Sequence, residues 1–511
     1  MSQQVYFGYG KAPVGLALDK LNRHGIIAGA TGTGKTVTLK VIAEQLSLAG
    51  VPVFLSDIKG DLASITEPGS SQEVAERLKE TNYDNFETRT FPIELWDALG
   101  ENGIPIRVTV SEMGPILLAR LLGLNDTQTS ILNVVFSVAD DEGLLLIDLM
   151  DLRAMLNYVG EQAKELKDIY GSISKASIGV ILRSIKVLED QGGDVFFAEP
   201  SLDIKDFIKT NDEGLGMINI LDAVSLYQTP FLYATVLLAL LSELYETLPE
   251  VGDLDKPKLV FFFDEAHVLF NNAPTVLIEK IELVVRLIRS KGVSVFFVTQ
   301  NPTDIPDKVS SQLANRIQHG LRAYTPKELK VVNAVADTFR QDVDSDIDLA
   351  TTIQELATGE AVVSHLDAEG TPTIAEKVMV YPPMSKLSVI DSQVKLQVIN
   401  HSTLLDKYSE AINRESAHEQ LNNLIEEREQ ALIQEADPDT AKMEPTKEDT
   451  SQDRIKELEE KLAKQIKESK SSSRKSNRDT SMDRFTKNVM SQVGREVGRI
   501  VSRSILGMFK K

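Results

Sequence analysis

The 511-residue sequence contains no cysteine, which excludes disulfide bonds and thiolate metal ligands. It also has no uncharged apolar run as long as a membrane-spanning helix. The longest apolar stretch, around Tyr233–Leu244, predicts a buried helix instead. The N-terminal residues Met-Ser-Gln-Gln-Val-Tyr show no basic region followed by an apolar one, so we expect no signal peptide. Together these absences predict a cytoplasmic protein.

Basic residues are scarce as well. Lys and Arg number 55 against 76 Asp and Glu, a formal charge of −21. Such a balance argues against a body that coats nucleic acid, although it leaves room for a local basic channel. The remaining composition, 42% apolar and 26% charged, is typical of a soluble globular protein, and the length allows more than one domain.

One stretch matches the phosphate-binding loop G-x-x-x-x-G-K-[ST] at every fixed position: Gly29-Ala-Thr-Gly-Thr-Gly-Lys-Thr36. An apolar run precedes it, and apolar residues at helical spacing follow it, so a strand–loop–helix unit is predicted. Its backbone N–H groups and positive helix end would hold a polyphosphate, which predicts binding of a nucleoside triphosphate such as ATP. The residues expected to bind nucleotide are Gly29, Thr31, Gly32, Thr33, Gly34, Lys35, Thr36 and Val37.

Hydrolysis needs further groups, and the segment Lys258–His267 supplies them. A strand of apolar residues ends in Asp264 and Glu265, beside the predicted loop. We expect Asp264, through water, and Thr36, directly, to hold Mg²⁺. Glu265 is then placed to act as the general base toward the attacking water.

Two other predicted strands end in polar residues at the same edge. Gln300 follows an apolar strand, and its amide both donates and accepts, which suits a sensor of the γ-phosphate; a strand cap is the alternative. Asp57 and Lys59 follow the second strand and should face the nucleotide, because ligands lie beyond the carboxyl ends of parallel strands. Ordinary capping of the loop would also explain these two residues.

Arginine neutralises charge on a transferred phosphoryl group, and three arginines are candidates. Arg286 and Arg289 lie on the predicted helix between the Asp264 strand and the Gln300 strand, and Arg316 precedes the next strand. Each of them could reach the nucleotide of a neighbouring subunit, or be an ordinary surface residue.

The pattern along the chain predicts an α/β fold with a mainly parallel sheet. Strands alternate with helices from Asn22 to Pro383, and a mostly helical insertion falls at about residues 112–200. The domains expected are an ATPase core over 1–390, a charged helical extension over 391–469, and a basic linker with an amphipathic helix over 470–511. The predicted strands are Gly25–Ala28, Val53–Ser56, Met217–Ile220, Leu259–Phe263, Ser294–Thr299 and His319–Arg322, with an edge pair at Glu360–His365 and Lys377–Val380.

The C-terminal region differs in composition from the core. Lys470–Lys511 carries eleven Lys and Arg against three Asp and Glu, and Lys470–Asp479 is predicted to be disordered. From Phe485 to Phe509, apolar residues recur mostly at steps of three and four, with arginines on other faces. This amphipathic helix suits an anionic membrane surface or a partner, and equally a docking site on its own core or on a sister subunit.

With these residues in place, the chain resembles the HerA/FtsK branch of P-loop ATPases, and most closely the bacterial HerA-like proteins of the YjgR type. The resemblance covers Asn22 to about Pro383 and continues less clearly to Ser416. It rests on the segments Asn22–Thr36, Phe54–Asp61, Phe263–His267, Arg286–Gly292 and Val298–Pro302.

The resemblance implies a RecA-like fold, with Lys35, Thr36, Asp264, Glu265 and Gln300 in the roles argued above. It further implies hexameric rings that couple ATP hydrolysis to DNA translocation, with Arg289 acting on the adjacent subunit's nucleotide. One departure concerns the N-terminal β-barrel of HerA: about 28 residues precede Gly29, too few for such a barrel.

Three functions therefore compete. The first is a ring-forming, helicase-like ATPase motor that acts on DNA. The second is an ATPase that works on a protein or a membrane-associated partner through the basic C-terminus. The third is a nucleotide-dependent assembly switch with little turnover.

Overall fold

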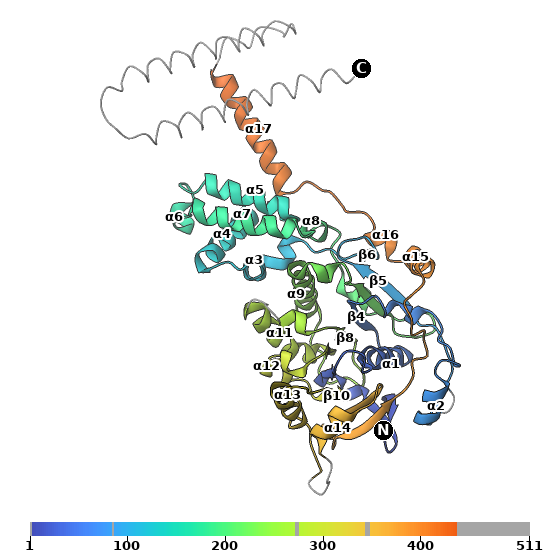
Figure 1. Cartoon of the computed structure of the whole chain (residues 1–511). Coiled ribbons are helices and arrows are strands. Elements are labelled where there is room, and N and C mark those ends of the chain that lie inside the picture. The colour runs from blue at the N-terminus through green and yellow to red at the C-terminus, as the bar shows by residue number, and fades with distance from the viewer. Residues whose placement is uncertain (1–2, 84–85, 271–274, 343–347, 437–511) are drawn as a thin grey trace, which may run out of the picture. The chain divides into compact units, whose positions relative to one another are not determined.

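A computed structural model describes residues 3–83, 86–270, 275–342 and 348–436. Its described strands form one 12-stranded sheet, in the order β2-β1-β12-β11-β10-β3-β9-β8-β4-β7-β5-β6 (Figure 1). Neighbours from β10 to β6 run parallel, and those from β10 to β2 run antiparallel. The strands are β1 Gln4–Tyr9, β2 Pro13–Ala17, β3 Gly25–Ala28, β4 Val53–Asp57, β5 Ile93–Asp97, β6 Ile104–Pro105, β7 Ile218–Asp222, β8 Leu259–Phe263, β9 Val293–Thr299, β10 Asn315–His319, β11 Glu360–Ser364 and β12 Glu376–Val380.

Continuous apolar sequence produces the parallel centre of the sheet, because a strand covered on both faces needs apolar side chains in both directions. In β8, all five residues Leu-Val-Phe-Phe-Phe are buried. Phe261 and Phe263 pack into the core on one face, and Phe262 packs against Phe296 in the core on the other. The expected mainly parallel α/β sheet is confirmed.

The prediction of a strand at His319–Arg322 is wrong, since the strand β10 runs from Asn315 to His319. Its sequence, Asn-Arg-Ile-Gln-His, does not look like a buried strand. The polar side chains are nevertheless accommodated: the Asn315 amide donates to the carbonyl of His24 at 2.9 Å, and the Gln318 amide donates to that of His319 at 2.7 Å. The Asn315 partner lies 291 residues away, so it is invisible in the sequence.

Four strands were not predicted. β1 and β2 form an antiparallel hairpin beyond the predicted β11–β12 pair, which therefore is not the edge of the sheet. At the opposite side, β5 and β6 extend the parallel part next to β7. These strands are short or mixed in character, so their pattern is weak.

Helices cover both faces of the sheet. α1, which follows the predicted phosphate loop, contributes Leu39 and Ile42 to one core. α9 and α11 cover the opposite face, where Leu240 and Val284 pack against the Phe261 side of β8. The helices are α1 Lys35–Leu48, α2 Ala75–Thr81, α3 Val110–Leu121, α4 Asp126–Glu142, α5 Leu149–Glu161, α6 Lys167–Tyr170, α7 Lys175–Glu189, α8 Gly193–Phe196, α9 Pro230–Thr247, α10 His267–Phe270, α11 Thr275–Leu287, α12 Asp307–Ser310, α13 Pro326–Ala336, α14 Leu349–Glu355, α15 Ser392–His401, α16 Leu405–Tyr408 and α17 Ala417–Ala436.

The expected helical insertion corresponds to the group α3–α8, which lies beside α9 and α11 (Figure 1). Local sequence sets its boundaries. Asn125 and Asp148 each form a capping box at the start of a helix, which satisfies N–H groups that the helix leaves unpaired. In α7, Ile178, Ile181 and Ile185 recur at helical spacing and are buried, so the helices share one apolar core.

The segment after β12 packs along the core. Lys395 in α15 forms an ion pair with Asp222 at 2.6 Å. Tyr408 in α16 is fully buried, and its hydroxyl donates to Asp206 at 2.6 Å. The predictions for residues 437–511, including the amphipathic helix, lie outside the described residues. Within the described ranges, no helix combines the length and the apolar character needed to cross a membrane.

Candidate active site

The loop between β3 and α1 has a backbone conformation that only glycine adopts easily. Gly32 and Gly34 have φ angles of 78° and 114°, where a side chain would be strained. A Cβ atom on Gly29 would lie 2.5 Å from the Cβ of His319, so no larger residue fits there. The glycines of the motif thus let the loop curl over the start of α1, whose free N–H groups then face the loop.

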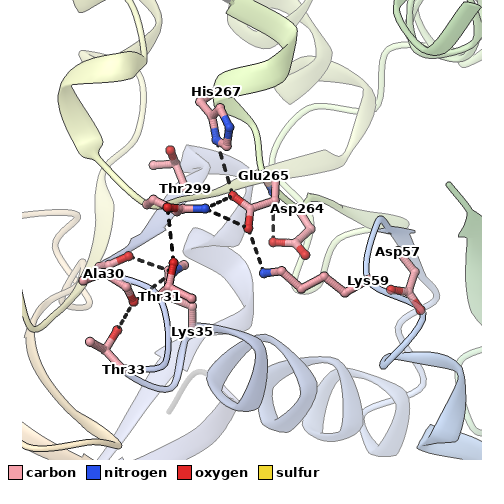
Figure 2. Close-up of polar contacts among 12 residues, drawn as sticks. Ala30, Thr31, Thr33, Lys35, Asp57, Lys59, Asp264, Glu265, His267 and Thr299 are labelled. Carbon is pink, nitrogen blue, oxygen red and sulfur yellow. Dashed lines mark hydrogen bonds and ion pairs between the residues drawn. The ribbon is translucent and has the colours of Figure 1, made fainter. Parts of the chain in front are cut away.

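Lys35 is buried at the first position of α1. Its ammonium donates to the carbonyls of Gly29 and Ala30 at 2.7 and 3.1 Å, so it spans the loop from inside (Figure 2). Burial lowers the pKa of Lys35, and the nearby charge of Glu265 opposes that shift. Thr36 is half-buried one residue further along, and Val37 packs on the core beneath.

Asp264 follows β8 and is only 2% exposed. Its Oδ1 accepts the backbone N–H of Glu265 at 2.9 Å. Among the described residues, none offers a hydrogen bond to its buried Oδ2. Burial raises the pKa of Asp264 to about 7, and the positive charge of Lys59 works against this. A buried carboxylate oxygen without a donor is what a cation would satisfy.

Glu265 has a φ of 46°, which is unusual for a residue with a side chain and indicates local strain. Its carboxylate lies at the centre of the site (Figure 2). The Gln300 amide donates to it at 3.1 and 3.3 Å, and Lys59 forms an ion pair at 2.7 Å. His267 Nδ1 lies 3.3 Å away. Despite burial, the Lys59 and Gln300 contacts hold the pKa of Glu265 below its usual value.

The strand order explains why these groups meet. β9 lies between β3 and β8 in register, so Gln300, at the end of β9, sits between the loop and the acidic pair. Gln300 Oε1 accepts the Thr31 hydroxyl at 3.3 Å while its amide nitrogen donates to Glu265. The structure therefore brings Lys35, Glu265 and Gln300 together, with Gln300 bridging the loop to the acid.

Two supports of the loop were not predicted. His319 lies under the loop and shares a hydrogen bond with the Thr38 hydroxyl at 2.8 Å. Gly359 donates its N–H to the Thr33 carbonyl at 2.9 Å, which ties the turn before β11 to the loop. Both lie about 300 residues from the loop in sequence. Only the pairing of β10 with β3 places them there, and no local pattern signals it.

Asp57, the last residue of β4, and Lys59, in the loop that follows, make different contacts. Asp57 accepts the backbone N–H groups of Gly60 and Leu62 at 2.7 and 3.0 Å, so it caps its own loop. Burial raises the pKa of Asp57 to about 6. Lys59 instead extends from this loop to Glu265 (Figure 2).

The arginines are not part of this cluster. Arg289 lies in the turn between α11 and β9, at the amino ends of the strands, whereas Lys35 and Asp264 lie at their carboxyl ends. It is 3.9 Å from the exposed Asp253. Arg286 is exposed. Arg316 is half-buried in β10 and donates to the Ser310 carbonyl at 3.1 Å.

The residues present fit a magnesium–nucleotide complex. A loop of backbone N–H groups with a buried lysine suits the phosphates, and the free Oδ2 of Asp264 and the Thr36 hydroxyl are oxygen ligands of the kind that Mg²⁺ prefers. Within the described ranges, no three His, Asp or Glu residues form a metal cluster.

The site combines a phosphate loop after β3, two acids after β8, and a polar residue at the end of β9, the strand that lies between those two. These features define this protein as a P-loop NTPase with a RecA-like fold. The family model for "Helicase HerA-like C-terminal" matches residues 4–511, so the chain belongs to the HerA-like family. The predicted family is thereby confirmed.

The comparisons with known proteins include distant relatives. The DNA double-strand break repair helicase HerA of Sulfolobus acidocaldarius is 24% identical over 371 residues, which cover 68% of this chain and 64% of that protein. Among solved structures, the plasmid coupling protein TrwB in complex with ADP and Mg²⁺ has a TM-score of 0.49 and 15% identity, and covers 76% of this chain and 92% of its own. VirB4 of Thermoanaerobacter pseudethanolicus has a TM-score of 0.45 and 16% identity, with coverage of 78% and 99%.

Proposed function

We propose that this HerA-like chain binds ATP with Mg²⁺ and hydrolyses the ATP to ADP and phosphate. The observation that carries the proposal is the meeting of Lys35, Asp264, Glu265 and Gln300 at one edge of the sheet. These side chains come from the end of β8, the end of β9 and the start of α1, and nucleotide hydrolysis accounts for all of them at once.

In the binding step, the N–H groups of the loop and the start of α1 hold the phosphates, and Lys35 neutralises part of their charge. Thr31 and Gly32 form the exposed rim of the loop, and Thr33 is half-buried. Thr36 and Asp264 would hold Mg²⁺, which, when bound, supplies positive charge next to the phosphate oxygens. The raised pKa of Asp264 fits this role, because a cation replaces the proton that burial favours.

In the chemical step, Glu265 takes a proton from the attacking water as the water oxygen bonds to the terminal phosphorus. The bond from that phosphorus to the bridging oxygen breaks, and ADP leaves. Gln300 orients Glu265 through its amide and contacts Thr31 of the loop through its oxygen, which suits a sensor of the bound phosphate. A base positioned in this way contributes about 10²- to 10⁴-fold in rate.

We further propose that the chain works as a hexameric ring that moves DNA, with Arg289 completing the neighbour's site. Arg289 lies at the other edge of the sheet from its own loop, and its ion pair with the largely exposed Asp253 is 3.9 Å long. Such a pair is weak and easily exchanged for a phosphate. Family membership and the name of the Sulfolobus relative, a DNA repair helicase, support DNA as the substrate.

The substitution Glu265→Gln tests the hydrolase. It keeps the size of the side chain, so the variant should still bind ATP while turnover falls about 10²-fold or more. Glu189→Gln is the matched control, since Glu189 pairs with Arg153 in the helical insertion and should leave turnover unchanged. Turnover in Glu265→Gln equal to that of the wild type would overturn the assignment and favour a slow assembly switch.

The motor is tested separately. Light scattering after size exclusion, with and without ATP, should show a hexamer, and DNA should stimulate the ATPase. An ATPase without DNA stimulation from low to high salt would leave the hydrolase intact and refute DNA as the substrate, in favour of a protein or membrane-associated partner.

A further inference from the structure

The loop that follows β4 is built to present one lysine. Asp57 is buried, and its two carboxylate oxygens accept the N–H groups of Gly60 and Leu62. Gly60 has a φ of 75°, so the turn closes tightly just after Lys59. Because β4 pairs with β8, this loop lies beside Asp264 and Glu265.

Lys59 forms an ion pair with the proposed base, Glu265. Its ammonium lies 2.7 Å from Glu265 Oε1, while the two Glu265 oxygens also accept from Gln300. The Glu265 side chain is only 5% exposed, so little of it remains open to an incoming water. In this arrangement the carboxylate is fixed in place but already occupied.

The two lysines of the site differ in how firmly they are held. The Lys35 ammonium donates to two loop carbonyls and is buried at the base of the loop. The Lys59 side chain is 39% exposed, and its ammonium forms an ion pair with Glu265. A flexible, partly solvated lysine exchanges one anionic partner for another at small cost. A terminal phosphate, with its high negative charge, is the stronger competitor.

We propose that Lys59 is a specificity-determining residue that moves from Glu265 to the γ-phosphate of a bound nucleoside triphosphate. The move distinguishes triphosphate from diphosphate, since ADP has no group to draw the ammonium away. It also frees one oxygen of Glu265 to accept a hydrogen bond from water. This inference rests on the proposed function, because it assigns a substrate contact to the same site.

The test measures affinity for two nucleotides by isothermal titration calorimetry with Mg²⁺: ADP and the non-hydrolysable ATP analogue AMP-PNP. In Lys59→Met, which keeps the length of the side chain, we expect AMP-PNP to bind at least tenfold more weakly and ADP to change less than twofold. Lys59→Arg should restore AMP-PNP affinity to within about threefold. Lys395→Met, which removes the lysine of the Lys395–Asp222 pair, should change neither.

Glu265→Gln gives an independent test, in which the affinity for AMP-PNP should rise rather than fall. Without the carboxylate charge, Lys59 is no longer held back, so AMP-PNP should bind several-fold more tightly while ADP is unaffected. In the double variant with Lys59→Met this gain should vanish. ADP binding serves in each variant as the check on folding.

The outcomes separate this inference from the proposed function. Equal loss of ADP and AMP-PNP in Lys59→Met would mean a structural role for the lysine, and no loss would mean no contact with phosphate. Either result, or an AMP-PNP gain in Glu265→Gln that survives loss of Lys59, overturns the inference with the ATPase intact. Wild-type protein that binds neither nucleotide would instead overturn the proposed function itself.

Discussion

Mild acid should weaken the fold beneath the phosphate loop, because His319 is buried there without charge. The carbonyl of Glu360 can only accept, so His319 Nδ1 carries the proton and donates to it at 2.8 Å. Nε2 then accepts the Thr38 hydroxyl, also at 2.8 Å. Protonating Nε2 would remove that acceptor and place a charge in the core. Burial accordingly lowers the pKa of His319 to about 4.

The sign and size of the effect follow from linkage. Since the pKa in the folded protein lies below the unfolded value of 6.5, the unfolded state binds more protons between about pH 4 and pH 6.5. The stabilisation is therefore complete above pH 6.5 and is lost as pH falls toward 4. At pH 5.5 the loss amounts to about 1.4 kcal/mol. This pH keeps clear of the isoelectric point near 4.9, where solubility is lowest.

The assay uses the single tryptophan of the chain. Trp96 is fully buried in β5 and donates to the Asn219 side chain at 3.0 Å, so its fluorescence reports unfolding of the sheet. Urea unfolding of the wild type and of His319→Gln is compared at pH 7.5 and 5.5. Glutamine does not titrate, so the wild type should lose about 1.4 kcal/mol more than the variant between the two pH values. Equal losses in both proteins would refute the reasoning.

Two further predictions concern the loop and the core. Gly34→Ala forces a side chain onto a φ of 114° with its Cβ 3.2 Å from Gly359, so nucleotide affinity should fall at least tenfold in calorimetry with the unfolding curve little changed. Gly123→Ala, also at positive φ but in open space, is the control and should bind normally. Phe262→Ala removes the ring that stacks on Phe296, with centroids 5.1 Å apart, and leaves a cavity in the core. It should lower the free energy of unfolding by about 3 to 5 kcal/mol. A loss below about 1 kcal/mol would mean that this core does not hold β8.

Much of the fold was predictable because the central strands carry their signal locally. β3 and β8 begin and end at the predicted residues, since each is a continuous apolar run between polar neighbours. β10 was misplaced because its buried polar residues are satisfied only by distant partners such as the His24 carbonyl. The hairpin β1–β2 was missed because strands of mixed character gain their stability from the neighbour on which they pair.

The sequence by itself determined the chemistry available. The glycine-rich loop, Lys35, Asp264 with Glu265, and Gln300 each stand at the end of a predicted strand, where local pattern and motif spacing are enough to mark them. It also excluded thiolate chemistry through the absence of cysteine.

Only the tertiary structure decided which of these groups touch. Strand order is a property of long-range pairing, so no local pattern places β9 between β3 and β8 or brings the loop of Lys59 alongside Glu265. The same pairing puts His319 under the loop and Arg289 at the opposite edge of the sheet. The residue types come from the sequence, whereas their contacts arise from a sheet whose neighbours lie hundreds of residues apart.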